Sequence, residues 1–400
     1  MATTSVIRPS GSAARMARIS VSATAAVSME AEKLRAAGVS LVDFGMGEPD
    51  FPTPEHIKQA AIAAIQENFT RYTAASGIAA LKDAIRQRHR DDFGSQYERD
   101  EVLVTVGGKH ALFNAISALV DHGDEVILPA PYWVSFKDQI TYAGGTPVIV
   151  ATDEADGFRL SAEMIARQVT ARTRMILLNS PSNPSGAVFP PETFRGVLEL
   201  CRERGIWLLS DECYSKFVYD GRPYSAASEP NGKEWLIIAG SLSKTYAMTG
   251  WRLGYLMAPK AVIKAAVNLQ SHSTSNATSF VQKAGIAALL GPQEPVSQML
   301  AEYARRRTVI VEGLRAVPGV TCNMPAGAFY AYPNISGLLG KPGVKTPLEF
   351  ASKLLAEGGV VTVPGEAFGT SSHIRFSYAA SLDAIHEGLA RFACFCAKLR

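Results

Sequence analysis

Short runs of β-forming residues alternate with longer helical patterns through the middle of this chain, and this alternation constrains the fold more than any other feature. The expected strands are nearly continuous apolar runs at 101–106, 125–128, 146–150, 174–179, 207–210 and 236–239, and the expected helices lie at 111–120, 133–143 and 194–204. Runs that are apolar on both faces are typical of strands covered by helices on both sides. The pattern therefore predicts an α/β fold with a mostly parallel central sheet.

The C-terminal part of the chain shows a different pattern. A long amphipathic helix is expected at 295–315, shorter strands at 328–332, 360–363 and 374–377, and a surface loop rich in Gly, Pro and Lys at 336–347. These elements predict a second, smaller α+β domain. We expect residues 1–47 to form an N-terminal arm and part of the small domain, residues 48–293 the large domain, and residues 294–400 the small C-terminal domain.

Length and charge exclude several classes of protein. A chain of 400 residues with 47% hydrophobic residues can bury more than one domain core, which argues against disorder. Its 40 Lys and Arg residues nearly balance 37 Asp and Glu residues, and the longest basic run is 305–307, so nucleic-acid binding is not indicated. Apolar stretches are too short to span a membrane, and we expect no membrane association.

The five cysteines show no paired C-x-x-C spacing, which predicts a reducing, cytoplasmic location and no metal site. Cys394 and Cys396 lie on an expected amphipathic C-terminal helix, where buried structural thiols are expected. Structural roles are also expected for His110 and His272, because neither has a partner at ligand or triad spacing.

The N-terminus allows two interpretations. Residues 1–28 contain Arg8, Arg15 and Arg18 and no acidic residue, a composition that resembles a transit peptide. A helical pattern from Ser28 to Gly38 instead suggests that the fold begins by about residue 14. We favour a short cytoplasmic extension.

The most informative segment is the one that contains Lys244. This lysine directly follows an expected buried strand, with Ser241 and Ser243 just before it and Arg252 eight residues after it. An amine that can form an imine, beside hydroxyl and guanidinium donors for a phosphate, is what pyridoxal phosphate requires. A lone S-x-x-K is more often an ordinary surface turn, and the further motifs of a serine β-lactamase are absent.

Polar residues follow other expected strands as well. Asp211 could pair with a protonated pyridine nitrogen, although an acid at a strand end can also cap a helix or form a salt bridge. Asn183 offers an amide within a proline-rich turn. Gly107, Gly108 and Lys109 precede a helix, where amide groups suit a phosphate, but the Gly and Ser/Thr positions of a P-loop are not present.

Two further side chains are candidates for ligand contacts. Trp133 follows an expected strand and could stack on an aromatic cofactor, although core packing is the commoner role. Arg375 lies in an expected strand at 374–377 and could bind a carboxylate through both of its terminal nitrogens. The alternative for Arg375 is an ordinary arginine on the surface of a strand.

Taken together, these motifs resemble the class I aminotransferases, which are pyridoxal-phosphate enzymes of fold type I. The resemblance covers about residue 14 to the C-terminus, and within the family it is nearest to the aspartate aminotransferases of the Iβ type. Its anchors, in chain order, are GMGEPDF at 45–51, GGKHALFNAI at 107–116, PAPYWVSF at 129–136, NPSG at 183–186, DECY at 211–214, SKTYAMTGWRLGY at 243–255, and Arg375.

The resemblance implies a role for each of these residues. Lys244 would hold the cofactor covalently and then move a proton between the substrate Cα and the cofactor. The other cofactor contacts implied are Asp211 on the ring nitrogen, Asn183 and Tyr214 on the phenolic oxygen, Trp133 on the ring face, and Ser241, Ser243, Arg252 and the amides of Gly108 and Lys109 on the phosphate. Arg375 and Asn183 would bind the substrate α-carboxylate, with Trp133 and the backbone of Gly47 lining the pocket. Tyr72 would reach the phosphate of the other subunit, which implies a homodimer.

The resemblance implies transfer of an amino group from an L-amino acid to a 2-oxo acid such as 2-oxoglutarate. Lys109 matches a lysine implicated in recognising a distal carboxylate, which favours aspartate as the donor. Ser20 occupies the position of a second basic residue found in some relatives, which leaves an aromatic or broad-specificity aminotransferase open and argues against prephenate. A carbon–sulfur β-lyase could use the same groups. A cofactor-sensing regulator would need a DNA-binding module for which the N-terminus has no room.

Overall fold

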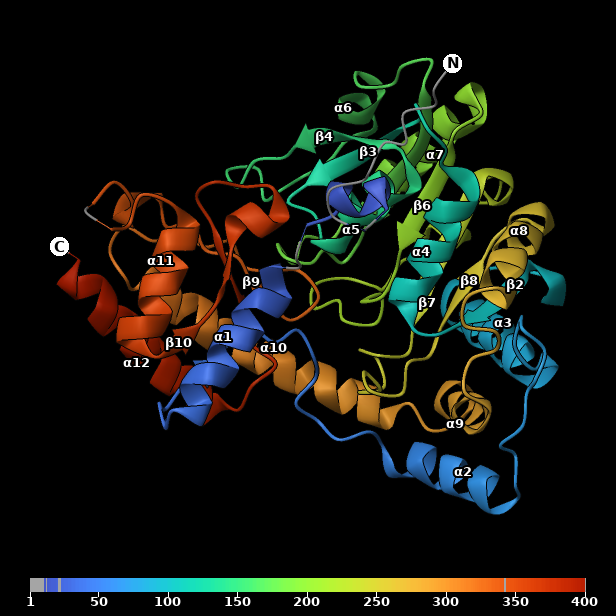
Figure 1. The fold of residues 1–400 in the computed structure, drawn as a ribbon, viewed down its shortest axis with the longest axis horizontal. Coiled ribbons are helices and arrows are strands. Elements are labelled where there is room, and N and C mark those ends of the chain that lie inside the picture. Colours follow the sequence, from blue (N-terminus) through green and yellow to red (C-terminus); the bar gives the residue numbers. More distant parts are fainter. Residues whose placement is uncertain (1–10, 12, 21–22, 342, 400) are drawn as a thin grey trace, which may run out of the picture.

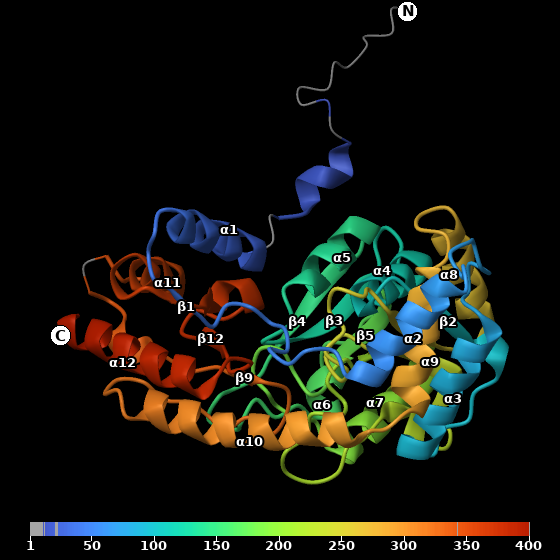
Figure 2. The ribbon, with the colours of Figure 1, turned by 90° about the horizontal axis from the view of Figure 1, so that it is seen from below.

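The computed structural model describes residues 11, 13–20, 23–341 and 343–399. Figures 1 and 2 show a larger part, built around a central sheet, and a smaller part that contains α11, α12 and β12 at the opposite end of the molecule. The long helix α10 (Glu294–Arg315) runs along both parts and packs against α12 (Leu382–Lys398). The chosen boundaries at residues 47/48 and 293/294 stay predictions.

A seven-stranded sheet forms the centre of the larger part. Its strands in spatial order are β2 (Val102–Thr105), β8 (Gly254–Met257), β7 (Leu236–Ser241), β6 (Trp207–Asp211), β5 (Thr173–Asn179), β3 (Glu125–Ala130) and β4 (Thr146–Ala151). Only β8 pairs antiparallel with its two neighbours, and the other neighbouring pairs are parallel. The mostly parallel sheet is therefore confirmed, whereas β8 is a strand that the sequence pattern did not predict.

Helices cover both faces of this sheet. They are α2 (Glu55–Gln66), α3 (Ala79–Phe93), α4 (Gly108–Leu119), α5 (Ser135–Ala143), α6 (Ala162–Ala166), α7 (Pro191–Arg204), α8 (Lys260–Ser271) and α9 (Ser279–Leu290). Alternate strand residues face opposite ways, so Leu177 and Leu209 pack in the cluster with α4, α5 and α8, whereas Ile176 and Leu208 pack in the cluster with α3, α7 and α9. This two-sided burial is the reason that the strands are continuously apolar.

The smaller part contains two small sheets. One pairs β1 (Val42–Asp43) with β10 (Val360–Val361), and the other has the order β11 (Val363–Pro364), β12 (Ile374–Ser377), β9 (Tyr330–Ala331). The helices α1 (Ala23–Ala36), α11 (Pro347–Lys353) and α12 pack around them. Phe376 of β12 lies edge-on to Phe392 of α12, with ring centroids 5.4 Å apart. This contact fixes one face of β12 in the core, and Arg375 lies on the opposite face of the strand.

The loop after β4 joins the two parts. The Glu154 carboxylate accepts hydrogen bonds from Thr321 Oγ1 at 2.7 Å and from Asn334 Nδ2 at 2.8 Å, and it lies 3.3 Å from His373 Nε2. His373 directly precedes β12. Glu154 therefore ties the strand that carries Arg375 to the sheet that carries the other candidate site residues.

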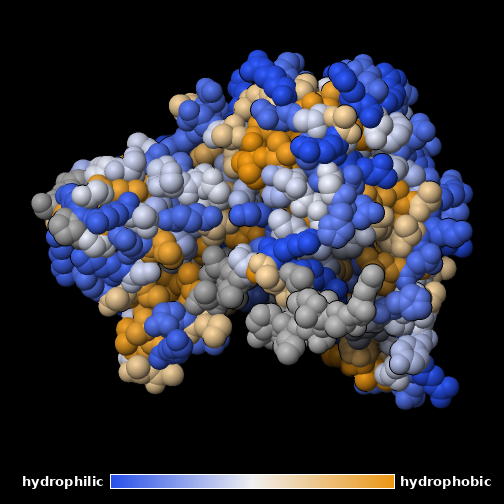
Figure 3. Space-filling model, turned by 45° about the horizontal axis from the view of Figure 1, so that its top comes forward, coloured by the Kyte–Doolittle hydropathy of each residue, from blue (hydrophilic) through white to orange (hydrophobic). Residues whose placement is uncertain are grey.

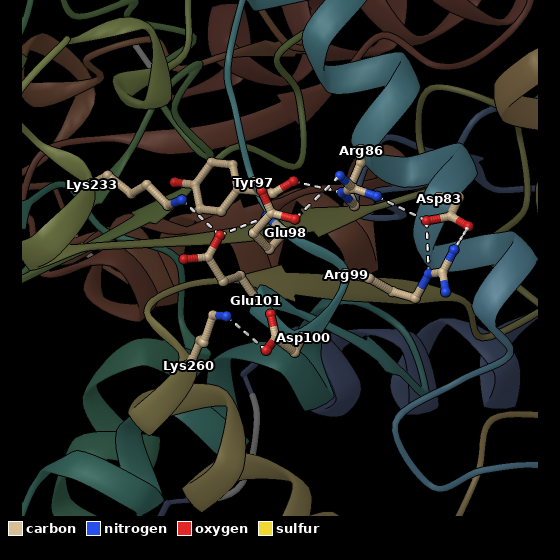
Figure 4. A network of polar contacts seen from close by, with 9 residues as sticks. All are labelled: Asp83, Arg86, Tyr97, Glu98, Arg99, Asp100, Glu101, Lys233 and Lys260. Atoms are coloured by element: carbon tan, nitrogen blue, oxygen red, sulfur yellow. Dashed lines mark hydrogen bonds and ion pairs between the residues drawn. The ribbon is translucent and has the colours of Figure 1, made fainter.

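A network of charged side chains holds the start of β2, at the edge strand of the sheet (Figure 4). Asp83 of α3 pairs with Arg99 Nη2 at 2.5 Å and with Arg86 Nη1 at 2.9 Å, and Lys260 Nζ of α8 pairs with Asp100 at 2.9 Å. The short 3-10 helix η2 (Arg99–Glu101) is therefore tied to two helices. The other end of β2 leads into the glycines at the start of α4, so this network anchors one wall of the site described below.

Several local predictions were wrong. Helix α1 begins at Ala23, not at Ser28, and the strands expected at 328–332 and 360–363 shorten to Tyr330–Ala331 and to the separate pairs Val360–Val361 and Val363–Pro364. The segment 336–347 is not purely a surface loop, since Leu338 and Val344 in it are buried. Cys396 is buried as expected, but Cys394 is exposed because it lies on the outer side of α12.

The N-terminal prediction is tested only in part. A short 3-10 helix, η1 (Ala14–Arg18), contacts α5, so ordered structure is present from Ala14. Arg8, like all of residues 1–10, lies outside the described residues. In the part of the chain that is described, no helix is long and apolar enough to cross a membrane. Hydrophilic side chains cover most of the face drawn in Figure 3, with smaller hydrophobic patches among them.

Candidate active site

The carboxyl ends of the parallel strands meet at one edge of the sheet, which is where ligands bind in open α/β sheets. Asn179, Asp211 and Ser241 are the last residues of β5, β6 and β7. They line a cavity of about 490 Å³ that also receives residues from the smaller part of the molecule. The sheet thus gathers side chains that are far apart in the sequence.

Nearly all of the predicted site residues line this one cavity. They are Gly47, Gly108, Lys109, Trp133, Asn183, Asp211, Tyr214, Ser241, Ser243, Lys244, Arg252 and Arg375. Tyr72 does not line it and is 91% exposed. Sequence reasoning did not assign roles to seven other lining residues: Gly45, Met46, Leu112, Asn179, Cys213, Thr249 and Tyr330.

Lys244 extends into the cavity from the turn after β7. Its Nζ donates a hydrogen bond to the backbone oxygen of Gly47 at 2.5 Å. Burial lowers the pKa of Lys244, against smaller opposite effects of Cys213 and Glu48. A lower pKa raises the fraction of uncharged amine near neutral pH, and the uncharged amine is the form that acts as nucleophile or base.

Asp211 is a buried carboxyl group without a cationic partner among the described residues. Its Oδ1 accepts a hydrogen bond from the Cys213 amide at 3.0 Å. Burial raises the pKa of Asp211 to about 7, more than that hydrogen bond lowers it. A buried carboxyl group of this kind fits a cationic ring nitrogen, because such a partner would restore the charge that burial disfavours.

The raised pKa predicts how the stability of the cofactor-free protein depends on pH. Between the unfolded pKa of about 4 and the folded pKa of about 7, the native carboxyl keeps its proton while the unfolded one loses it. The Asp211 contribution to the free energy of unfolding therefore falls as pH rises through this window, by up to about 4 kcal/mol. We expect Asp211→Asn, which cannot ionise, to lose less stability than the wild type between pH 5 and pH 7.5 in urea denaturation. Parallel pH profiles of the two proteins would contradict this assignment.

Glycines and hydroxyl groups form a cradle at the start of α4. Gly107 has a φ of +82°, and a Cβ atom there would lie 2.7 Å from Arg252 Nη2, so the backbone and the guanidinium need a glycine at this position. The Ser243 amide donates to Ser241 Oγ at 3.1 Å, and Arg252 Nη1 donates to the Thr249 oxygen at 2.9 Å. Amides of a helix N-terminus, two hydroxyls and a guanidinium are a donor set suited to a phosphate.

Lys109 and Trp133 form another wall. The Lys109 ammonium lies 5.0 Å from the centre of the Trp133 ring, and the Trp133 ring packs edge-on against Phe136 at 5.3 Å. Burial, with a smaller effect of Arg252, lowers the pKa of Lys109. No ion pair of Lys109 is found among the described residues, so this cation faces the cavity without a carboxylate.

Arg375 is 2% exposed, so the interpretation of this residue as a surface arginine is wrong. Its Nη1 donates to Asn183 Oδ1 at 3.0 Å and its Nη2 to the Gly45 oxygen at 2.7 Å. The backbone N–H of Asn183 donates a hydrogen bond to Asn179 Oδ1 at 2.9 Å, which holds Asn183 in place. Within the described structure Arg375 has no carboxylate partner and its Nε has no hydrogen bond. A buried guanidinium without a counter-charge is suited to bind a carboxylate.

Tyr330 is the main site residue that the sequence did not reveal. Its hydroxyl lies 2.7 Å from the Tyr214 hydroxyl, and the Arg375 guanidinium lies 4.6 Å from the centre of its ring. Both tyrosines are buried. The only signal in the sequence is an aromatic-rich strand, which is more often part of a core.

Ser20, which the resemblance aligns with a basic residue, does not line the cavity. It is exposed, and its backbone amide and hydroxyl both donate to the Asp138 carboxylate at 3.0–3.1 Å. No group of three or more metal-ligating His, Cys, Asp or Glu side chains occurs in the described structure.

Comparison with known proteins agrees with this geometry. The family described as aminotransferase class I and II matches residues 39–392. The chain is 44% identical to the aspartate aminotransferase of Geobacillus stearothermophilus over 95% of this chain and 97% of that enzyme. It superimposes with a TM-score of 0.92 on the crystal structure of the aspartate aminotransferase from Rhizobium meliloti, at 43% identity over 96% of this chain and 98% of that chain. It also superimposes with a TM-score of 0.92 on the aspartate aminotransferase from Thermus thermophilus with maleate, at 39% identity over 96% of this chain and 99% of that chain.

The family match covers most of the chain, and the relatives are similar over nearly their whole length. The sheet, the smaller part and the cavity between them agree with fold type I of the pyridoxal-phosphate enzymes. The chain belongs to the class I and II aminotransferases.

Proposed function

We propose that this aminotransferase uses pyridoxal 5′-phosphate to move the amino group of an L-amino acid, aspartate first, to a 2-oxo acid such as 2-oxoglutarate. Three features of the cavity support this cofactor: the partly buried amine of Lys244, the unpaired buried carboxyl of Asp211 and the donor cradle at Gly108. When bound, the cofactor supplies an aldehyde that condenses with amines and a ring that accepts electrons from the substrate Cα.

The residues of the chain would divide the work. Asp211 would keep the ring nitrogen protonated, and Lys244 would act as the base that takes the proton from the substrate Cα. Asn183 and Tyr214 would hold the phenolic oxygen, and Trp133 would pack against the ring. The phosphate would be held by Ser241, Ser243, Arg252 and the amides of Gly108 and Lys109.

The substrate would be oriented by its α-carboxylate. Arg375 and Asn183 bind that carboxylate, and the backbone of Gly47 borders the reacting carbon. Fixing this end of the substrate decides which bond at Cα lies across the acceptor ring, which is the main contribution of a protein to this chemistry.

The observation that carries the choice of aspartate is the surplus of cations in the cavity. Lys109, Arg252 and Arg375 line it without any carboxylate partner in the described structure, whereas Asp211 is the one acidic residue among the lining side chains. A phosphate, an α-carboxylate and a second carboxylate on the substrate would balance these three charges. The Thermus thermophilus relative binds maleate, a dicarboxylate, which supports the same substrate class.

The test is a panel of amino donors with 2-oxoglutarate, in which the absorbance of the bound cofactor follows its conversion to the amine form. Aspartate is expected to convert the cofactor faster than phenylalanine, alanine or cystathionine. Faster conversion with phenylalanine would favour an aromatic or broad-specificity aminotransferase. Pyruvate and ammonia from cystathionine, without conversion by any donor, would favour a carbon–sulfur β-lyase.

Lys109→Met tests whether Lys109 binds the side-chain carboxylate of the substrate. The loss of one charged hydrogen bond predicts a rise of about 10- to 100-fold in the KM for aspartate, and little change in the KM for alanine. Steady-state kinetics of both donors measures this difference. An equal loss for aspartate and alanine would assign Lys109 to the cofactor alone.

We infer that the active unit is a homodimer in which Tyr72 reaches the phosphate of the other subunit. Support comes from the 91% exposure of Tyr72 and from exposed apolar side chains nearby, namely Ile62 and Ile65 on α2 and Leu290 on the adjacent α9. Burial of such residues between two copies would remove apolar surface from water. The cytoplasmic location expected from the cysteine pattern also stays a prediction.

Mixed dimers test the shared site. Tyr72→Ala and Lys244→Ala subunits are each expected to be weakly active or inactive alone. A mixed dimer has one site with both residues intact, so random mixing should restore about a quarter of the wild-type activity. Sedimentation gives the oligomeric state independently. No recovery in mixed dimers would exclude the contribution of Tyr72 across the interface.

A further inference from the structure

The hydroxyl of Tyr330 lies where three elements of the cavity meet. It lies 2.7 Å from the hydroxyl of Tyr214. Tyr214 is in the segment after β6 of the large sheet, whereas Tyr330 is on β9 of the smaller part. A Cβ atom at Gly47 would lie 2.7 Å from the same Tyr330 hydroxyl. The oxygen of Gly47 accepts the hydrogen bond of Lys244. One buried hydroxyl thus contacts both the tyrosine and the glycine segment of the candidate active site.

The pairing of the strands fixes this position. Ser377 of β12 pairs with Tyr330 of β9, and Arg375 lies two residues from Ser377 on the same face of the strand. The Arg375 guanidinium therefore covers the Tyr330 ring at 4.6 Å, with Phe368 at 5.2 Å from it. Neither the ring nor the hydroxyl of Tyr330 can move without displacing one of these neighbours, because Tyr330 is fully buried.

The distance between the two phenols allows either hydroxyl to be the donor. Burial raises the pKa of both, so both keep their hydrogen near neutral pH. A phenol has only one hydrogen to donate. When Tyr214 gives its hydrogen to the phenolic oxygen of the cofactor, Tyr330 is therefore the donor to the Tyr214 oxygen.

The geometry points to Tyr330 as a positioning residue, which donates to Tyr214 and so aims and strengthens the hydrogen bond that Tyr214 gives to the phenolic oxygen of the cofactor. This rests on the proposed function, since it needs that cofactor. Hydrogen bonds in series polarise one another, so the hydroxyl of Tyr330 strengthens the donor that follows it. Because Tyr330 and Tyr214 come from different parts of the molecule, their bond also requires both parts to be correctly placed.

Tyr330→Phe removes this hydroxyl and keeps the ring beneath Arg375. The readout is the pH midpoint of the visible absorbance change of the bound cofactor. A donor at the phenolic oxygen stabilises the form that has lost its proton, so a weaker donor moves the midpoint upward. We also expect kcat to fall about two- to tenfold with the KM for the amino donor unchanged.

Tyr332→Phe is the matched control. Tyr332 lies two residues further along the chain, is 2% exposed, and its hydroxyl is 2.6 Å from Thr370 Oγ1, away from Tyr214. It also loses a buried hydroxyl group, but the absorbance midpoint should stay at the wild-type value. The same midpoint in the wild type, Tyr330→Phe and Tyr332→Phe would overturn the proposal.

A second test needs no cofactor. Gly47→Ala places a Cβ against the Tyr330 hydroxyl, and with phenylalanine at 330 the next ring atoms are at an ordinary 3.5–3.6 Å. Gly47→Ala should therefore lower the melting temperature of the cofactor-free protein in the wild-type background, and lower it less in the Tyr330→Phe background. Equal losses in both backgrounds would contradict the placement of Tyr330. Failure of the proposed function is distinguishable, because the wild type itself would then convert no amino donor.

Discussion

Lys244→Ala is expected to reduce kcat by about 10⁴-fold or more, because the proposed mechanism assigns to this lysine both the role of base and the covalent link to the cofactor. The lysine is partly buried, its amine donates to the Gly47 oxygen at 2.5 Å, and burial lowers its pKa. Among the described residues Lys109 is the only other lysine that lines the cavity, and its ammonium lies over Trp133. No neighbouring amine is therefore placed to replace the one that is lost.

Single-turnover absorbance measurements with aspartate test this prediction directly. The cofactor should still bind through its phosphate contacts, but it should be released more easily and convert at a rate near that of free cofactor. Lys264→Ala, at an exposed position on α8, is the control for a lysine outside the cavity. Normal turnover in the Lys244 variant would remove the proposed mechanism.

Arg375→Leu is expected to lower kcat/KM by about 10²–10³-fold for every amino donor and oxo acid, because the proposed function assigns this buried guanidinium to the substrate carboxylate. The effect should not depend on the side chain of the substrate, unlike that of Lys109→Met. The leucine can pack against Phe368 and Tyr330, which now contact the guanidinium. Removal of a buried charge that lacks a counter-charge in the described structure should leave the cofactor-free protein at least as stable as before.

Arg375→Lys separates charge from geometry. Lysine keeps the positive charge but cannot form two parallel hydrogen bonds, so an intermediate loss is expected. Kinetics with aspartate and alanine, together with cofactor titration, measures the prediction. If Arg375→Leu weakened cofactor binding as strongly as catalysis, Arg375 would belong to the cofactor site and not to the substrate carboxylate.

Some elements could be predicted because their cause is local. The strand ending at Asp211 is apolar at successive positions because both of its faces are covered, as Leu208 and Leu209 show by packing in opposite clusters. Lys244 was predicted from a strand followed by hydroxyls, glycines and an arginine. In each case the evidence lies within a few residues, since the periodicity of a strand and the chemistry of a turn are short-range properties.

Other features depended on contacts between distant segments. The sequence could not tell whether Arg375 is a surface residue or a buried one, because its burial arises from Gly45, Asn183 and the aromatic rings that surround it. Ser28 was expected to begin a helix that in fact starts at Ala23, since local helix signals do not fix boundaries well.

The sequence alone thus determined the class of fold, the order of its elements and most of the groups that line the cavity, because parallel strands present their carboxyl ends at one edge. Only the tertiary structure decided the burial of Arg375, the exposure of Tyr72 and the place of Tyr330 beside Tyr214. Tyr330 shows the physical reason most clearly. Its hydroxyl meets Tyr214 through the pairing of β9 with β12 and the packing of the smaller part against the sheet, and no local pattern records a contact between residues 116 positions apart.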